Sequence, residues 1–115
     1  MNLFAEALNG ALVVRVDEER IDAAIAMRFK DRMREVTAQP STRVVLDMSQ
    51  VDFLDSSGLG AVVAVMKSLA PNRRLELAGL TPNVAKVFQL TRMDTVFRIH
   101  TDVEAALQEG LRNAG

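Results

Sequence analysis

Two short apolar runs open the chain. They span Leu3–Leu8 and Ala11–Val16, and the dipeptide Asn9-Gly10 separates them. Apolar runs of this length are typical of β-strands, and both residues of an Asn-Gly pair tolerate the positive φ angles of a type I′ turn. The pattern therefore predicts an antiparallel hairpin at the start of the fold.

A helical period follows the hairpin. Asp22 is a good N-cap residue, and after it apolar side chains recur every three or four positions while charged side chains take the other faces. The apolar positions are Ile25, Phe29, Met33 and Val36. We expect an amphipathic helix of about four turns that begins after Asp22 and ends before Gln39-Pro40-Ser41.

The middle of the chain has the pattern of a strand, a helix and a second strand. Arg43–Met48 is apolar and β-branched, as in the central strand of a sheet, and Arg73–Ala78 predicts the next strand. Between them, a helical period that begins at Ser56 carries apolar residues on one face. These residues are Leu59, Val62, Val63, Met66 and Leu69. A crossover of this kind joins parallel strands and is right-handed.

The last third of the chain predicts a helix, a strand and a final helix. Thr81-Pro82 combines an N-capping hydroxyl with a proline at the first helical position, so we expect a third helix from there to near Arg92. Val96–His100 predicts a short last strand. The segment from Thr101 to Glu104 has the spacing of a capping box, and it predicts a final helix that runs through Leu111.

These elements predict the fold class. A chain of 115 residues with 49% hydrophobic content is large enough for one core, and it shows no linker or internal repeat. We therefore expect a single domain over residues 1–115. Strands that alternate with helices after an opening hairpin predict a small α/β sandwich, with a mixed five-stranded sheet and about four helices.

Charge and composition exclude several classes of function. The chain holds 14 Lys and Arg against 15 Asp and Glu, so its net charge of -1 provides no overall field for nucleic acid or an anionic membrane. It has no cysteine, no run near the ~20 apolar residues of a membrane span, and no signal-peptide pattern at its start. We expect a cytoplasmic protein that neither enters a membrane nor binds nucleic acid directly.

Catalytic motifs are weak or missing. The only histidine is His100, and a hydrolytic triad would have to bring it beside Ser56 or Ser57, neither of which lies in a GxSxG elbow. Gly58-Leu59-Gly60 lacks the third glycine of a dinucleotide fingerprint, and no Walker lysine motif is present. We therefore expect no catalytic residue and no cofactor, with weak nucleotide hydrolysis by the loop aspartates as an open alternative.

Metal and nucleic-acid sites have simpler explanations. Asp47, Asp52 and Asp55 carry oxygen ligands that suit magnesium, but the last two fit better as turn and helix N-terminal residues, so no metal site is predicted. Basic residues between Arg20 and Arg34 alternate with acidic ones, which is typical of a solvated helix face.

The turn Asp55-Ser56-Ser57-Gly58-Leu59-Gly60 places two hydroxyls at a predicted helix start. Taken alone, one of the serines would cap the helix, a role worth about 1 kcal/mol. The small residues of the turn would leave its backbone open to a partner, and Leu54, Leu59 and Val62 would frame an apolar patch. A phosphate here would add about −1.5 to −2 charges beside Asp55 and inside that contact surface. The turn is therefore either a plain cap or a switch that acts on binding.

The segment VVLDMSQVDFLDSSGLGAVVAVMK, from Val44 to Lys67, resembles the STAS domain family, and within it the bacterial anti-sigma factor antagonists. The hairpin, the RIDAA segment from Arg20 and the LAGLTPNVAKVFQLTRMD segment from Leu77 extend the resemblance over nearly the whole chain. Asp22 matches the family's aspartate after the second strand. Relatives often have glycine two or three residues before that aspartate, whereas this chain has Glu19-Arg20.

The resemblance implies a partner-switching mechanism. It identifies Ser56 as the phosphoacceptor, with Ser57 as second choice, and implies that the unmodified protein binds an anti-sigma factor that is also a serine kinase of the GHKL type. Phosphorylation would release the antagonist, and a PP2C-type phosphatase would reset it. The implied partner-binding residues are Asp22, Asp55, Ser56, Ser57, Gly58, Leu59 and Gly60. A STAS domain that serves another complex without switching, such as a lipid-transport ATPase or a signalling assembly, is the alternative.

Overall fold

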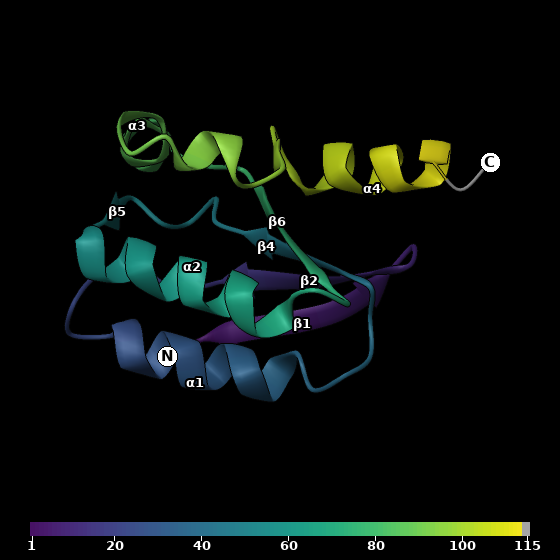
Figure 1. Cartoon of the computed structure of the whole chain (residues 1–115), viewed down its shortest axis with the longest axis horizontal. Coiled ribbons are helices and arrows are strands. Elements are labelled where there is room, and N and C mark those ends of the chain that lie inside the picture. Colours follow the sequence, from purple (N-terminus) through teal and green to yellow (C-terminus); the bar gives the residue numbers. More distant parts are fainter. Residues whose placement is uncertain (114–115) are drawn as a thin grey trace.

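A five-stranded mixed sheet forms the centre of the molecule (Figure 1). The structure, a computed structural model, describes residues 1–113. The strands follow the order β1-β2-β4-β6-β7, in which β1 and β2 are antiparallel and the other neighbours are parallel. Their bounds are β1 (Leu3–Leu8), β2 (Ala11–Val16), β4 (Arg43–Asp47), β6 (Arg74–Ala78) and β7 (Ile99–His100). This is the predicted mixed sheet, and the β4–β6 crossover is parallel as expected.

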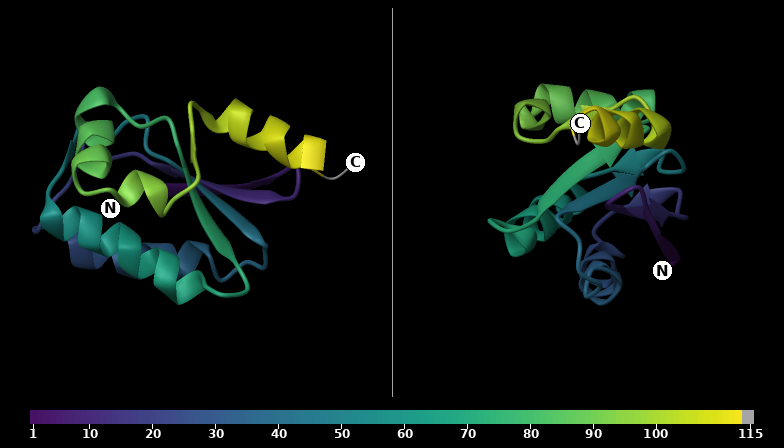
Figure 2. Two further views of the ribbon diagram at one scale, coloured as in Figure 1. Left: turned by 45° about the horizontal axis from the view of Figure 1, so that its top comes forward. Right: turned by 90° about the vertical axis from the view of Figure 1, so that its right-hand side faces the viewer.

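Four α-helices cover the sheet, as predicted. In the view of Figure 1, α1 and α2 lie below the sheet and α3 and α4 lie above it; the views of Figure 2 show the same layers. Their bounds are α1 (Ala26–Val36), α2 (Ser56–Leu69), α3 (Pro82–Leu90) and α4 (Val103–Asn113), and a short 3₁₀-helix, η1 (Met93–Thr95), follows α3. None of the helices within residues 1–113 has the length and apolar content needed to cross a bilayer.

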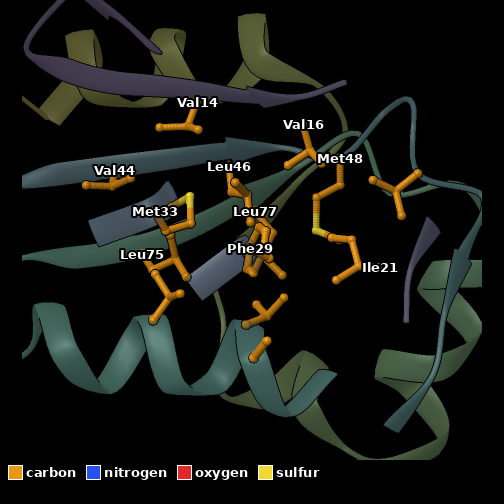
Figure 3. Close-up of a cluster of buried hydrophobic side chains, with 14 of the residues drawn as sticks. Val14, Val16, Ile21, Phe29, Met33, Val44, Leu46, Met48, Leu75 and Leu77 are labelled. Atoms are coloured by element: carbon orange, nitrogen blue, oxygen red, sulfur yellow. The ribbon is translucent and has the colours of Figure 1, made fainter. Parts of the chain in front are cut away.

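The main core lies between the sheet and helices α1 and α2 (Figure 3), and Val84 and Phe88 of α3 are buried in the same cluster. Phe29 and Met33 of α1 and Leu46 and Leu77 of the central strands are fully buried there. A smaller cluster lies on the other face, where Ala106 of α4 is buried among strand residues. Because β4 is covered on both faces, its middle residues Val44, Val45 and Leu46 form a continuous apolar run, whereas β6 carries the buried Glu76 between Leu75 and Leu77.

The opening hairpin matches its prediction. Its strands have the predicted bounds, and Asn9 and Gly10 have φ angles of 48° and 81°. These positive angles are those of a two-residue turn between antiparallel strands, which explains why asparagine and glycine occupy it.

The first helix begins later than predicted. It starts at Ala26 and has about three turns, and its N-cap residue is Ile25. Asp22 instead closes the turn before the helix, because its Oδ1 atom accepts a hydrogen bond from the Ala24 N–H at 3.1 Å and its carbonyl accepts one from the Ala26 N–H at 2.9 Å. The prediction that Asp22 caps the helix is therefore wrong.

Two later caps also differ from the prediction. The Thr81 hydroxyl does not cap α3, since it donates to the carbonyl of Val51 at 2.8 Å and ties the helix to the loop after β4. At the start of α4, the Oδ1 atom of Asp102 accepts the Ala105 N–H at 2.7 Å, so Asp102 takes the capping role predicted for Thr101. Thr81 thus remains the N-cap residue of α3 without a side-chain cap bond, whereas at α4 the neighbouring aspartate supplies that bond.

The strand predicted over Val96–His100 is reduced to Ile99–His100. Helix α3 ends at Leu90, short of the predicted Arg92, and Arg92 has a φ angle of 63°. The chain then makes the 3₁₀ turn η1 before it reaches the sheet. Only Ile99 and His100 therefore pair with β6, opposite Leu77 and Ala78.

A second, two-stranded sheet was not predicted. Strands β3 (Arg20–Ile21) and β5 (Phe53–Leu54) pair in parallel beside the start of α2. Two residues are too few to produce a recognisable pattern in a sequence. This small sheet brings the loop before α1 next to the turn that carries the two serines.

Candidate functional site

Asp55 is the residue that caps α2. Its Oδ1 atom accepts the Gly58 N–H at 2.9 Å, and its backbone carbonyl accepts the Leu59 N–H at 2.9 Å. The hydrogen bond from Gly58 is the main cause that lowers the pKa of this carboxyl, and a further bond from Ala23 adds to it against the opposing effect of desolvation. The suggestion that a serine caps this helix is therefore wrong.

Both serine hydroxyls are left free by this arrangement. Ser56 and Ser57 occupy the first two positions of α2, and both are exposed. Within residues 1–113, neither hydroxyl forms a hydrogen bond with the protein. The hydroxyls are therefore available to an external molecule, and the fold does not depend on their hydrogen bonds.

The loop before α1 packs against this turn. The Oδ2 atom of Asp55 accepts the Ala23 N–H at 3.1 Å, so the carboxylate of Asp55 joins α2 to that loop. Asp22 lies next to Ala23, and its carboxylate accepts hydrogen bonds from the Ala24 N–H and from Nε of Arg20, the latter at 3.2 Å. The structure thus brings Asp22, which the family resemblance implied as a partner-binding residue, to the serine turn.

Two further residues at this surface were not predicted. The guanidinium of Arg20 lies over the ring of Phe53, with Cζ 4.4 Å from the ring centroid, and Phe53 is 40% exposed. The pairing of β3 with β5 sets these two residues opposite each other. The one signal in the sequence was an aromatic residue just before the serine turn, which carries little information until its partner strand is known.

The glycines of the turn have different roles. Gly58 is buried, and a Cβ atom at this position would collide with the carbonyl oxygen of Ile21. Gly60 is exposed, and a Cβ atom there would have nothing within 4 Å. The backbone is therefore open at Gly60, as expected. Gly58 is instead small because β3 packs against it, and Ala61 is buried.

The predicted apolar patch around the turn is not present. Leu54 and Val62 are buried in the core, and Leu59 is only partly exposed because it packs against that core. The surface around the serines is instead formed by short side chains, the carboxylates of Asp22 and Asp55, and the Arg20–Phe53 pair defined above.

The only histidine belongs to a different cluster. His100 is buried, and its Nε2 atom lies 2.8 Å from Oε1 of Glu76, a buried carboxylate on β6. Arg43 donates two further hydrogen bonds to Glu76, at 2.7 and 2.8 Å. Burial would raise the pKa of Glu76, but the hydrogen bonds from Arg43 and His100 outweigh it and lower this pKa to about 2.

This cluster joins strands β4, β6 and β7 to α4, because Arg43 also donates to the carbonyl of Ala106 at 3.0 Å. Its hydrogen bond to Glu76 raises the pKa of Arg43. His100 is held there by carboxylates, and it does not join Ser56 or Ser57 in a catalytic triad.

Two of the three loop aspartates, Asp47 and Asp55, bond to backbone N–H groups. Among the residues that the structure describes, no three carboxylate or imidazole side chains gather as metal ligands. Asp47 accepts the Ser49 N–H at 3.0 Å, and both oxygens of Asp55 accept backbone N–H groups. On α1, Arg32 pairs with Glu35 at 2.6 Å and Arg34 lies 3.8 Å from Asp31, as expected for a solvated helix face.

Comparison with known proteins identifies the family. The sequence profile of the STAS domain matches residues 2–106, which is most of the chain. The chain belongs to the STAS domain family. A relative of this STAS domain is the anti-sigma-F factor antagonist RsfB of Mycobacterium tuberculosis, 27% identical over 99 residues that cover 86% of this chain and 80% of RsfB.

Solved structures agree with this assignment. An anti-sigma factor antagonist from Mycobacterium paratuberculosis is 26% identical, with a TM-score of 0.83 over 94% of this STAS domain and 92% of that chain. SpoIIAA, an anti-sigma factor antagonist solved in its unphosphorylated form, shares the fold at 23% identity, with a TM-score of 0.74 over 97% of both chains. SpoIIAA has also been solved in a phosphorylated form, to which this STAS domain aligns with a TM-score of 0.67 and 22% identity over 94% of this chain and 98% of that one.

Proposed function

We propose that this chain, as a single STAS domain, is a cytoplasmic anti-sigma factor antagonist that is switched by phosphorylation of Ser56. Its partner is an anti-sigma factor that is also a serine kinase of the GHKL type, and a PP2C-type phosphatase resets it. Its relatives are named for antagonising anti-sigma factors, which is a regulatory role. In this function the chain is the substrate of the kinase and performs no catalysis itself.

The observation that carries the proposal is that Asp55, and not Ser56, caps α2. Asp55 caps α2, so the Ser56 hydroxyl at the next position is exposed and makes no bond within the described part of the chain. A kinase can therefore reach this hydroxyl without opening the fold. SpoIIAA, which shares the fold, has been solved in a phosphorylated form, and this supports a phosphorylated state in the family.

The transfer reaction needs only the hydroxyl and the kinase-bound nucleotide. The Oγ atom of Ser56 attacks the γ-phosphorus of ATP, the bond to the β-phosphate oxygen breaks, and ADP leaves. The hydroxyl proton passes to a base on the kinase. Hydrolysis of the phosphate ester by the phosphatase returns the free serine.

The new charge acts on the contact surface. A phosphate brings about −1.5 to −2 charges at neutral pH. It would stand beside the carboxylate of Asp55, whose oxygens already hold the Gly58 and Ala23 N–H groups, and close to Asp22. The phosphate adds its charge to two carboxylates that are already present, so it repels a partner that fits the unmodified surface.

The proposed partner surface consists of residues that the turn and the adjoining loop present. Ser56, Ser57 and Gly60 supply its exposed part, while the Asp22 and Asp55 carboxylates lie at its side. Leu59 is partly exposed, and Gly58 contributes by letting β3 pack closely against the helix. Arg20 and Phe53 extend this surface.

The test combines phosphorylation with binding. The chain is incubated with ATP and each GHKL-type kinase of its host, and mass spectrometry locates the phosphate. We expect phosphate on Ser56, no incorporation in S56A, and wild-type incorporation in S57A. Calorimetry with the same kinase should show S56D binding roughly tenfold or more weakly than wild type, which equals about 1.4 kcal/mol or more.

A charge-matched control is Q108E, which adds one negative charge on the exposed side of α4 and should bind as wild type does. Phosphate on Ser57 alone would move the switch to the neighbouring hydroxyl. Absence of phosphate with every kinase, together with wild-type binding by S56D, would contradict switching and favour a constitutive interface.

A further inference from the structure

Strand β1 is an unprotected edge of the main sheet. It lies at the end of the strand order, with β2 on one side and no strand on the other among residues 1–113 (Figure 2). Its residues from Phe4 to Ala7 are exposed on both faces of the sheet. The strand LFAEAL contains neither lysine nor proline, two residues by which proteins often keep an edge strand from pairing, and Glu6 is its one charged residue.

The pairing with β2 shows which backbone groups point outward. The Asp17 N–H donates to the Asn2 carbonyl at 2.9 Å, so these two residues form a hydrogen-bonded pair. Hydrogen-bonded and non-hydrogen-bonded pairs alternate along an antiparallel ladder. Phe4, Glu6 and Leu8 therefore bond to β2 as well, and the N–H and C=O groups of Leu3, Ala5 and Ala7 lie on the outer edge. Ala5 and Ala7 are exposed there, whereas Leu3 is buried and its carbonyl accepts a hydrogen bond from Nη2 of Arg32 at 3.5 Å.

We propose that β1 pairs with β1 of a second copy of this chain, antiparallel and about a two-fold axis at Ala5. In this register, Ala5 pairs with Ala5 of the second copy, and Leu3 of each chain pairs with Ala7 of the other. All three residues have outward backbone groups, so about six hydrogen bonds form across the interface when each Leu3 carbonyl exchanges its bond from Arg32 for one from the second strand. The two sheets become one continuous sheet.

On one face of this interface, Arg15 of each copy and Glu6 of the other carry opposite charges on the two sides of Phe4. Phe4 would lie directly opposite Glu6 of the second copy in a non-hydrogen-bonded pair, where side chains approach most closely. On its other side Phe4 already contacts Arg15 of its own chain, whose Cζ atom is 4.9 Å from the ring centroid. Each ring is thus placed between a guanidinium of its own chain and a carboxylate of the second copy.

These side chains are accessible to a partner. Helix α4 leaves this part of the sheet uncovered, and a hollow of about 420 Å³ lies over β1 and β2. Phe4, Glu6 and Arg15 line it, and Phe4 is 52% exposed.

Other registers are less favourable. An axis at Glu6 would set two carboxylates directly opposite each other, which destabilises a strand pair. An axis at Phe4 or Ala7 would move the strands along each other, so that fewer of the outward groups of Leu3, Ala5 and Ala7 find partners.

The interface leaves the serine turn free. Helix α2 packs against β6, whereas α1 is the helix that packs against β1. The proposed dimer would therefore present two Ser56 turns, one from each copy, and it does not depend on the switching function proposed above.

The test uses two variants that should each be monomeric alone and should dimerise when they are mixed. E6R carries arginine at both 6 and 15, and R15E carries glutamate at both positions, so each homodimer has like charges across the interface. In a mixed dimer, opposite charges meet at both ends. Sedimentation velocity over a concentration series should show a reversible dimer for wild type, monomers for each variant, and recovery of the dimer in the equimolar mixture.

Two further variants complete the experiment. E104R makes the same charge change as E6R on the exposed side of α4 and should dimerise as wild type does. A5P removes an N–H that points outward, a change that edge strands tolerate, so it should remain folded by circular dichroism and yet be monomeric. A wild-type protein that stays monomeric at its solubility limit, or a mixture that fails to dimerise while wild type does, would overturn the proposal.

Discussion

The Oδ2 atom of Asp55 accepts a hydrogen bond from the backbone N–H of Ala23 at 3.1 Å, which ties the first turn of α2 to the loop before α1. The same carboxylate caps α2 through its other oxygen, Oδ1, which accepts the Gly58 N–H. One side chain therefore holds together the two segments that carry Ser56 and Asp22.

Replacing this carboxylate should make the fold less stable in a pH-dependent way. The pKa of Asp55 lies below its ordinary value of 3.8, so its stabilising effect is fully present above that value and is lost as the pH falls through the lowered pKa. D55N should unfold at a lower urea concentration than wild type at pH 7. The difference between the two urea midpoints should become smaller below pH 3.8. Hydrogen exchange at the Ala23 amide should become faster.

A matched control for this prediction is D52N. Asp52 is an exposed loop residue close to the same turn. The urea midpoint of D52N should equal that of wild type across the pH range. An equal loss of stability in D52N and D55N would show that the Asp55 hydrogen bonds are not the cause.

The two turn glycines should respond oppositely to alanine. In G58A the new methyl group meets the Ile21 carbonyl, and overpacking of this kind costs about 1–3 kcal/mol, occasionally more. In G60A the methyl group meets no atom within 4 Å, so the better helix propensity of alanine should stabilise the protein by about 0.5–1 kcal/mol. Urea unfolding measures both changes, and equal effects would contradict the packing seen at Gly58.

Acid should weaken the fold through Glu76. Its pKa is lowered from 4.5 to about 2, so its contribution is complete above pH 4.5 and is lost as the pH falls towards about 2. Over this window the free energy of unfolding of wild type should fall more steeply than that of E76Q, which has no carboxylate to protonate. Parallel curves for the two proteins would contradict the lowered pKa.

Two arginine-to-methionine variants should separate a buried ion pair from an exposed one. R43M leaves the buried Glu76 carboxylate without its two strongest hydrogen bonds, and removal of one partner of a buried pair costs about 3–5 kcal/mol. R98M breaks an exposed pair with Glu109 and should have a much smaller effect. Differential scanning calorimetry gives the comparison, and similar melting temperatures would contradict it.

Local signals in the sequence predicted the elements that do not depend on distant contacts. The hairpin from Leu3 to Val16 was found from its Asn9-Gly10 turn between two short apolar runs, and the strand that begins at Arg43 was found because its middle residues are buried and apolar. The start of α2 at Ser56 was also correct, since a polar cap directly precedes an apolar helix face.

What the sequence did not reveal depends on contacts between distant segments. Three neighbouring polar residues, from Asp55 to Ser57, could each cap a helix, and the contact with Ala23 favours Asp55. Gly58 is needed because Ile21 packs against it, and β3 is too short to be recognised by pattern. The position of the small second sheet was therefore the information that the sequence alone did not provide.

Helix α2 keeps its packing residues and its surface residues on different sides. Gly58 and Val62 face the core, while Ser56 and Gly60, one turn apart, are exposed. Changes on the exposed side leave the core contacts intact, so a duplicated gene for this chain can acquire a new binding partner without first losing its ability to fold. The helix thus allows specificity to diverge between copies while the scaffold is inherited unchanged.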